Sequence, residues 1–286
     1  MSHMNPSPEW NKDALLGTPF FVPLHSFISC FEGTAFPTLQ DCNKLLAARE
    51  PLITVHSGEV LQFVPQEYGR LPFAEQYEPR CYLKGEVPTR ENNWHDLFNA
   101  LVWLAFPKAK AAINARHYRA LTGTSKAAGV ATHSQRGAVR DTNTLLDESG
   151  VIVVSADVEL ANLLRNFQWK ELFWTRRVQV QSSMRFYLFG HGLYEKALQP
   201  YVGMTGQGLL LPVGQEFFTL TPEQQLGHLD DLLSGYLSSN EHCQSTRELT
   251  PVPLLGVPGW AAENERAEYY GNTGYFRTGR KERPAS

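Results

Sequence analysis

Histidines, carboxylates and basic side chains recur at helical spacing through the middle of this chain, on segments that are otherwise apolar. Residues three or four apart lie on the same face of a helix, and a buried polar group left unpaired costs roughly 1–3 kcal/mol. Such side chains are therefore either paired with one another or used for chemistry. The catalytic candidates are His95, Asp96, His117, His191 and Glu195.

Two chemistries fit these residue types. Imidazole and carboxylate groups bind zinc, manganese or iron, and the bound metal turns water into a nucleophile near neutral pH. The cofactor is left open, with a divalent metal ion as the candidate, and its candidate ligands are His95, His117, His191 and Glu195. In the second chemistry, cationic side chains bind a phosphate or carboxylate, oriented by the bidentate fork of arginine. The anion-binding candidates are Lys110, Arg136 and Arg140.

The same polar side chains could instead be structural. A helical histidine commonly bonds a backbone carbonyl, Asp96 in a first turn complements the helix dipole, and the glycines beside His191 could allow a close backbone approach. A buried hydrogen-bond network would then fix the packing of the helices. Its members would include Asn99, Asn114, Asn143 and Asp147.

Two functions therefore stay open. The first is a hydrolase that acts on a small phosphorylated or carboxylated metabolite through a metal or anion site among the central helices. The alternative is a non-enzymatic binding or scaffold protein, whose central polar residues form a buried structural network.

These residues must be positioned by helices and a few strands. Asn92 or Asn93 can cap a helix, and Pro107 interrupts the apolar run that follows, so the spacing predicts two helices, over 94–106 and 108–121. Further helices are expected over 38–49, 134–148, 157–172, 183–198 and 221–237. The candidate strands are 61–64, 151–155 and 209–213.

The pattern predicts an α+β fold, namely a predominantly helical single domain with a few short strands and an extended aromatic C-terminal segment. We expect residues 1–4 to be a cloning remnant, 5–277 the globular domain and 278–286 a disordered tail. Within the domain, the expected parts are a proline-rich wrapping segment (5–90), a helical core (91–240) and an extended C-terminal wrap (250–277).

Composition narrows the partners. A net charge of −3 gives no electrostatic reason to expect nucleic-acid binding, and no apolar run is long enough to suggest a membrane span. No two cysteines have Cys-x2-Cys spacing, and no signal peptide is evident, so we expect a cytoplasmic protein with reduced thiols. The expected partner is a small-molecule substrate, and the oligomeric state is not predicted.

Four sequence blocks carry a family resemblance. They are WHDLFNALVWLAFPKAKAAINARHY, RDTNTLLDESG, LFGHGLYEKALQPYVGMT, and PLLGVPGW followed by NE, YY and FR. Together they resemble a bacterial family known as domain of unknown function 3025, over about residues 30–280. The resemblance implies one conserved module from a bacterial cytoplasm. Because no activity is attached to the family, it implies no catalytic roles.

Overall fold

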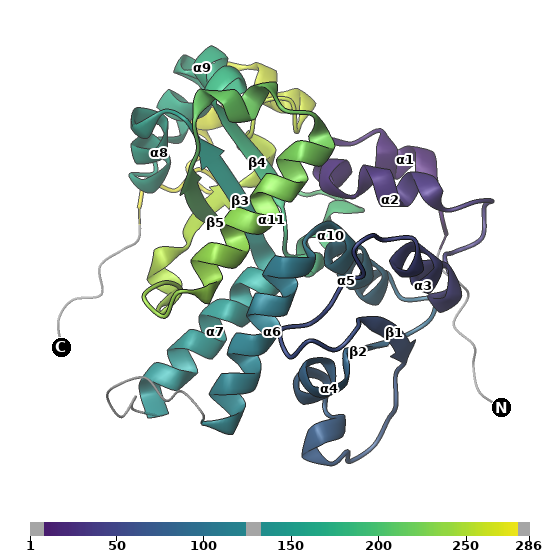
Figure 1. Ribbon diagram of the computed structural model, residues 1–286. Coiled ribbons are helices and arrows are strands. Elements are labelled where there is room, and N and C mark those ends of the chain that lie inside the picture. The colour runs from purple at the N-terminus through teal and green to yellow at the C-terminus, as the bar shows by residue number, and fades with distance from the viewer. Residues whose placement is uncertain (1–8, 124–132, 280–286) are drawn as a thin grey trace.

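A buried strand, β3 (Gly150–Ser155), lies at the centre of the larger sheet (Figure 1). Its run of valine and isoleucine is fully buried, as expected for β-branched residues in a central strand. β3 pairs antiparallel with β4 (Met184–Leu188) and parallel with β5 (Thr205–Pro212). At the edge, β6 (Thr250–Pro253) runs antiparallel to β5. The strand order is therefore β4-β3-β5-β6.

Helices form most of the molecule. The computed structural model describes residues 9–123 and 133–279, and it shows a predominantly helical α+β single domain. In Figure 1, α11 crosses in front of the larger sheet, and α6 and α7 run side by side below it. The helices that frame the central region are α5 (Trp94–Ala105), α6 (Pro107–Thr122), α7 (His133–Ser149), α10 (His191–Ala197) and α11 (Pro222–Ser238).

The start of α5 follows the sequence signals closely. Asn93 is the N-cap, and its side chain accepts a hydrogen bond from the backbone N–H of Asp96 at 3.0 Å. Pro107 separates α5 from α6, because proline is tolerated at the first position of a helix but breaks a helix interior. The predicted pair of helices is therefore confirmed.

The N-terminal region is more helical than its prolines suggest. The predicted helix at 38–49 is α3 (Leu39–Ala47), and the predicted strand is β1 (Gln62–Pro65), which pairs in parallel with β2 (Glu86–Thr89). Much of the remainder was expected to be extended, and this is wrong for the segments that form helices, although residues 48–72 contain no helix. Pro79 lies in the first turn of α4 (Tyr77–Lys84), where its missing N–H costs no helical hydrogen bond. The other helices here are α1 (Lys12–Leu16) and α2 (His25–Cys30).

Two predicted helices are shorter than expected. The helix over 183–198 is wrong in its first half, because Met184–Leu188 is strand β4, paired with β3, and α10 begins only at His191. In this segment, backbone hydrogen bonding to the buried strand β3 outweighs the helical spacing of the side chains. Likewise α8 (Val158–Arg165) ends early, because Phe167 takes a positive φ of 58° that no α-helix continues.

The C-terminal segment covers the core through short turns of helix in addition to β6. Its 3-10 turns are Leu254–Gly256, Ala262–Glu265 and Ala267–Gly271, so it is less extended than predicted. Tyr275 ties it down, since its hydroxyl donates to the carbonyl of Met204 at 2.7 Å and accepts from the N–H of Leu255 at 2.9 Å. The remnant predicted at 1–4 and most of the predicted tail lie outside the described residues.

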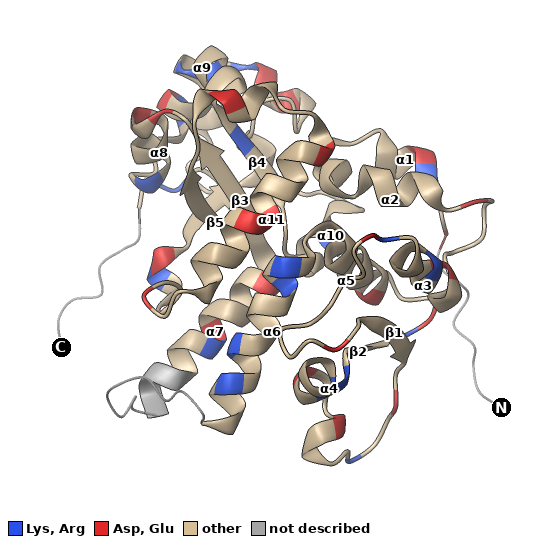
Figure 2. Cartoon of the chain, in the orientation of Figure 1, with Lys and Arg blue, Asp and Glu red and all other residues tan. Residues whose placement is uncertain are grey.

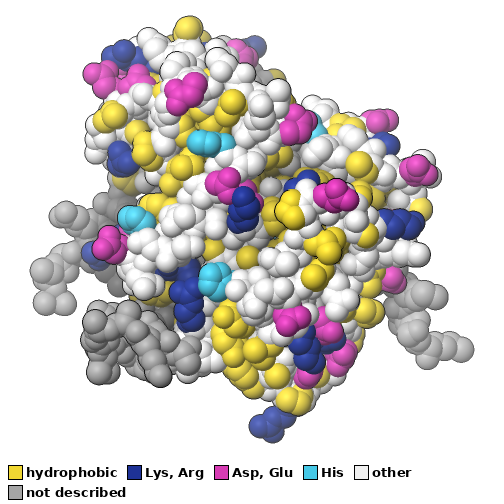
Figure 3. All heavy atoms as spheres, in the orientation of Figure 1, with side chains coloured by type: hydrophobic (Ala, Val, Ile, Leu, Met, Phe, Trp, Pro, Cys, Tyr) yellow, Lys and Arg dark blue, Asp and Glu magenta, His cyan; other side chains and the backbone are white. Residues whose placement is uncertain are grey.

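The outer surface mixes charges of both signs. Basic and acidic side chains are scattered over the molecule in Figure 2, and apolar side chains gather over the lower part of the face in Figure 3. The exposed apolar side chains of the described chain include Phe73, Leu83 and Leu121. Within the described ranges, no helix combines the length and apolar character needed to cross a bilayer.

A buried carboxylate joins α11 to α6. The N-cap residue of α6, Phe106, has no side-chain acceptor, and Asp230 of α11 supplies one instead. Its two oxygens accept hydrogen bonds from the backbone N–H groups of Lys108 at 3.1 Å and Ala109 at 2.8 Å. Asp230 therefore caps α6 from a neighbouring helix and fixes the two relative to each other.

Replacing Asp230 by alanine should lower the free energy of unfolding by about 1–2 kcal/mol, because the first N–H groups of α6 lose their acceptor. Urea denaturation measures this change. The matched control is Asp231→Ala, which removes only a surface ion pair with Lys108 and should cost less than about 1 kcal/mol. Equal losses in the two variants would contradict the capping role.

Candidate metal centre

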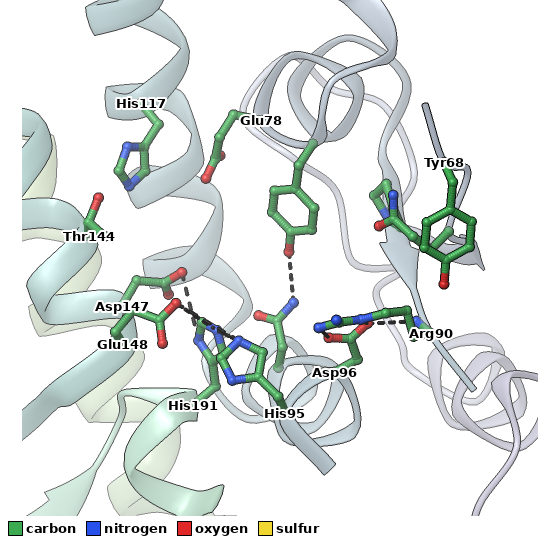
Figure 4. A pocket seen from close by; sticks show the side chains of 14 residues that line it. Tyr68, Glu78, Arg90, His95, Asp96, His117, Thr144, Asp147, Glu148 and His191 are labelled. Atoms are coloured by element: carbon green, nitrogen blue, oxygen red, sulfur yellow. Dashed lines mark hydrogen bonds and ion pairs between the residues drawn. The ribbon is translucent and has the colours of Figure 1, made fainter. Parts of the chain in front are cut away.

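A cavity of about 350 Å³ opens among α4, α5, α6, α7 and α10 (Figure 4). At one end of it lie His95 from the first turn of α5, His191 from the start of α10 and Glu148 from the end of α7. One potential ligand atom from each of these residues lies within 4.8 Å of the other two. The chain positions are far apart, so only the tertiary fold brings them together.

The three atoms have the spacing of metal ligands. The Nε2 atoms of His95 and His191 are 3.0 Å apart, and Glu148 Oε1 lies 3.5 Å from the His191 nitrogen and 3.9 Å from the His95 nitrogen. A point equidistant from atoms with these separations lies about 2.0 Å from each, which matches zinc–nitrogen and zinc–oxygen bonds of about 2.0–2.2 Å. An ion at that point would therefore lie within bonding distance of all three atoms.

The opposite ring nitrogens point toward further carboxylates. His95 Nδ1 is 3.1 Å from Glu195 Oε2, and His191 Nδ1 is 3.8 Å from Asp147 Oδ2. Metal-bound histidines usually donate their other N–H to a carboxylate or carbonyl, which fixes the tautomer and leaves a lone pair for the metal. Burial lowers the pKa of His191 to about 4, so its ring is neutral at neutral pH. The Glu195 contact can hold the His95 ring in this orientation, whereas the 3.8 Å between His191 Nδ1 and Asp147 Oδ2 is too long for a hydrogen bond.

Two glycines allow this arrangement. A Cβ on Gly190 would lie 2.4 Å from the backbone nitrogens of Ser149 and Gly150, and one on Gly192 would lie 2.7 Å from Glu148 Oε2. Real Cβ atoms essentially never come so close, so any larger residue would push α10 away from the end of α7. The close backbone approach and the ligand site are therefore the same feature.

A buried ion pair lies next to the centre, between Lys110 of α6 and Asp147 of α7. Lys110 Nζ, on a side chain only 3% exposed, lies 2.5 Å from Asp147 Oδ1 and donates to Asn99 Oδ1 at 2.9 Å. Asn99 in turn donates to the hydroxyl of Tyr77 at 2.7 Å. Burial, the largest influence, raises the pKa of Asp147, but the charges of Lys110 and the nearby histidines together outweigh it, and the pKa lies below its ordinary value. Asp147 is therefore a carboxylate facing His191.

The far wall of the cavity carries another acid. Glu78 accepts a hydrogen bond from Asn114 Nδ2 at 2.6 Å, and His117 also lines this wall (Figure 4). Burial raises the pKa of Glu78, although His117 and Asn114 partly oppose the effect. His117 is 6% exposed and is not part of the triad of converging ligand atoms.

The structure brings some of the predicted site residues together and separates others. His95, His191 and Glu195 lie together, with Glu195 behind His95 in place of facing the triad. Asp96 also lines the cavity, but it is held by Arg90 through contacts of 2.8 and 2.9 Å, and its Oδ2 accepts the Arg90 N–H.

Neither Lys110 nor Arg140, predicted to bind an anion, is among the residues that line the cavity. Lys110 is engaged by Asp147, and Arg140 is exposed. The side chain of Arg136 lies outside what the structure describes. Asn143, expected in the polar network, accepts from the buried Arg116 at 3.1 Å on another side of α6.

Sequence reasoning missed four contributors: Tyr77, Glu78, Arg90 and Glu148. Glu148 had a readable signal, because it follows Asp147 on a helix whose polar residues were already noted, and Gly150 ends that helix. Tyr77 and Glu78 had none, since they lie in the proline-rich region where no helix was expected.

The candidate centre lies in the part of the chain that matches a known sequence family. A family model described as "Protein of unknown function (DUF3025)" matches residues 61–280. The chain belongs to this family. Comparison with curated proteins and with solved structures gave no significant match. The DUF3025 region contains the triad, its supporting carboxylates and the far wall of the cavity, and the resemblance expected from the four sequence blocks is confirmed.

Replacing Lys110 by methionine should lower the free energy of unfolding by about 3–5 kcal/mol, because the Asp147 carboxylate loses its buried partner. Chemical denaturation measures the loss, and Lys110→Met combined with Asp147→Asn should recover part of it. Lys108→Met is the control on the same helix. Lys108 is 62% exposed, and its ion pair should be worth less than about 1 kcal/mol.

Proposed function

We propose that this DUF3025 protein is a metal-dependent hydrolase with a divalent ion held by His95, His191 and Glu148. The observation that carries the proposal is the convergence of two imidazole nitrogens and one carboxylate oxygen, 3.0–3.9 Å apart, at the end of a cavity. Three protein ligands leave a coordination position for water, as in catalytic zinc sites and unlike closed structural ones.

The local charges also favour a cation. Asp147 is balanced by Lys110, and Asp96 by Arg90. In the described part of the chain, Glu148 and Glu195 have ion-pair contacts only with imidazoles. Burial raises the pKa of Glu148, because the charged form of a partly buried carboxyl is less stable without a cation nearby. A divalent ion at the triad would stabilise that charged form.

The chemistry would divide between the ion and the chain. A bound divalent ion lowers the pKa of its water toward 7 and supplies a hydroxide at neutral pH. His95 and His191 would keep the ion in place, and Glu195 would fix the His95 ring through its outer nitrogen. The cavity of about 350 Å³ limits the substrate to a small molecule.

A purely structural role remains the alternative. The hydrogen bonds from Lys110 through Asn99 to Tyr77 form a continuous network that would stiffen helix packing with or without an ion. In that case His95 and His191 simply share a proton between their Nε2 atoms, 3.0 Å apart. Metal binding separates the alternatives.

Purified protein should contain about one divalent ion per chain, measured by elemental analysis after dialysis against zinc, manganese or iron salts in turn. Glu148→Gln and His95→Ala should each lower the affinity at least tenfold, because each removes a ligand. His117→Ala is the matched control, since His117 lines the same cavity outside the triad, and it should keep its metal. Metal-free wild-type protein would refute the centre.

Hydrolysis should depend on the same residues. We expect wild-type protein to cleave p-nitrophenyl esters or phosphates, to lose the activity with a chelator and to recover it when metal is returned. Glu148→Gln should remain folded but lower kcat/KM at least a hundredfold, because the water loses its activating ion. Full metal content with no cleavage of any test substrate would argue for a binding protein instead.

A further inference from the structure

The cavity wall across from the triad presents polar side chains that do not belong to the triad. Figure 4 shows Glu78 and His117 on the other side of the opening from His95 and His191. Tyr77 lines the same cavity, next to Glu78 in the first turn of α4. None of these groups is used by the metal centre, yet all of them face the space in which its substrate would lie.

The Tyr77 hydroxyl has a proton to donate. It accepts a hydrogen bond from Asn99 Nδ2 at 2.7 Å, which fixes the oxygen, and within the described chain no acceptor for its own proton is found. Burial raises the pKa of Tyr77 well above its ordinary value, so the hydroxyl keeps this proton at neutral pH. A ligand oxygen in the cavity would be its acceptor.

Glu78 is arranged in a similar way. Asn114 Nδ2 donates to Oε2 and also to the Glu78 carbonyl at 3.0 Å, while no bond to Oε1 is found among the described residues. Burial, the largest influence, raises the pKa of this carboxyl. In its protonated form a buried carboxyl can donate a hydrogen bond, and together with the Tyr77 hydroxyl it would form an oxyanion-binding site.

The charge around the centre sets what such a site can hold. The pairs Lys110–Asp147 and Arg90–Asp96 cancel, and Glu148 and Glu195 together balance a divalent ion at the triad. Each further negative charge in this partly buried site is therefore uncompensated. A carboxylate monoanion adds one such charge, whereas a phosphate dianion adds two.

We propose that the cavity binds a small carboxylate, with one oxygen at the metal and the other accepting hydrogen bonds from Tyr77 and Glu78. This inference rests on the proposed metal centre. It places the substrate among carboxylic esters and amides. Their hydrolysis adds the hydroxyl of water to the acyl carbon and its proton to the leaving oxygen or nitrogen, and the carboxylic acid formed is ionised at neutral pH.

The test uses the full chain loaded with cobalt(II), whose visible absorption changes when a ligand enters its coordination sphere. Acetate and inorganic phosphate are titrated separately at pH 7. We expect acetate to bind more tightly than phosphate, and Tyr77→Phe to weaken acetate binding about tenfold through the lost hydrogen bond. Glu78→Leu should weaken it similarly, and Glu78→Gln, which keeps an N–H donor, should restore most of the affinity.

Tyr68→Phe is the matched control, because Tyr68 also lines the cavity but is 80% exposed at its rim, and it should leave acetate binding unchanged. Melting temperature and cobalt content are measured for every variant, so that loss of the fold or the ion is recognised. Equal effects of Tyr77→Phe and Tyr68→Phe, or tighter binding of phosphate, would overturn the carboxylate site and leave the metal centre standing. Failure of the wild-type protein to bind cobalt would overturn both.

Discussion

The contact between the end of α7 and the start of α10 is the constraint on which the rest of the site depends. Gly190 lets the two backbones approach more closely than any Cβ would permit, and Gly192 leaves room for the Glu148 side chain. This contact places His191 beside both Asp147 and Glu148, the last acidic residues of α7. Because β3 starts at Gly150, directly after α7, the larger sheet holds one side of the contact in place.

Around this contact, the protein compensates each buried charge with a partner from another element. Lys110 of α6 neutralises Asp147 of α7, and Asp230 of α11 accepts hydrogen bonds from the N–H groups at the start of α6. Removal of one partner leaves the other buried and unpaired, which costs more than the intact pair contributes. Glu148 and Glu195 differ from these acids, because their ion-pair contacts in the described chain are with histidines alone, and this supports the proposed cation site.

Much of the fold was predictable where local and tertiary preferences agree. Asn93 and Pro107 fix the ends of α5 and α6 through capping and the missing proline N–H, and the β-branched run predicts β3. The predictions failed where tertiary pairing overrides local spacing. Met184–Leu188 has residues that suit a helix, but the neighbouring β3 offers backbone partners along its whole length, and the segment becomes β4.

The candidate site divides in the same way. The sequence by itself determined that His95, His191 and Glu195 belong on helices with polar residues on apolar faces, because helical spacing is a local property. Only the tertiary structure decided that Glu148 replaces Glu195 in the triad, that His117 stands apart, and that Tyr77 and Glu78 close the cavity. The physical reason is that a ligand set depends on distances of about 2–4 Å between atoms from different helices, which spacing along one helix does not define.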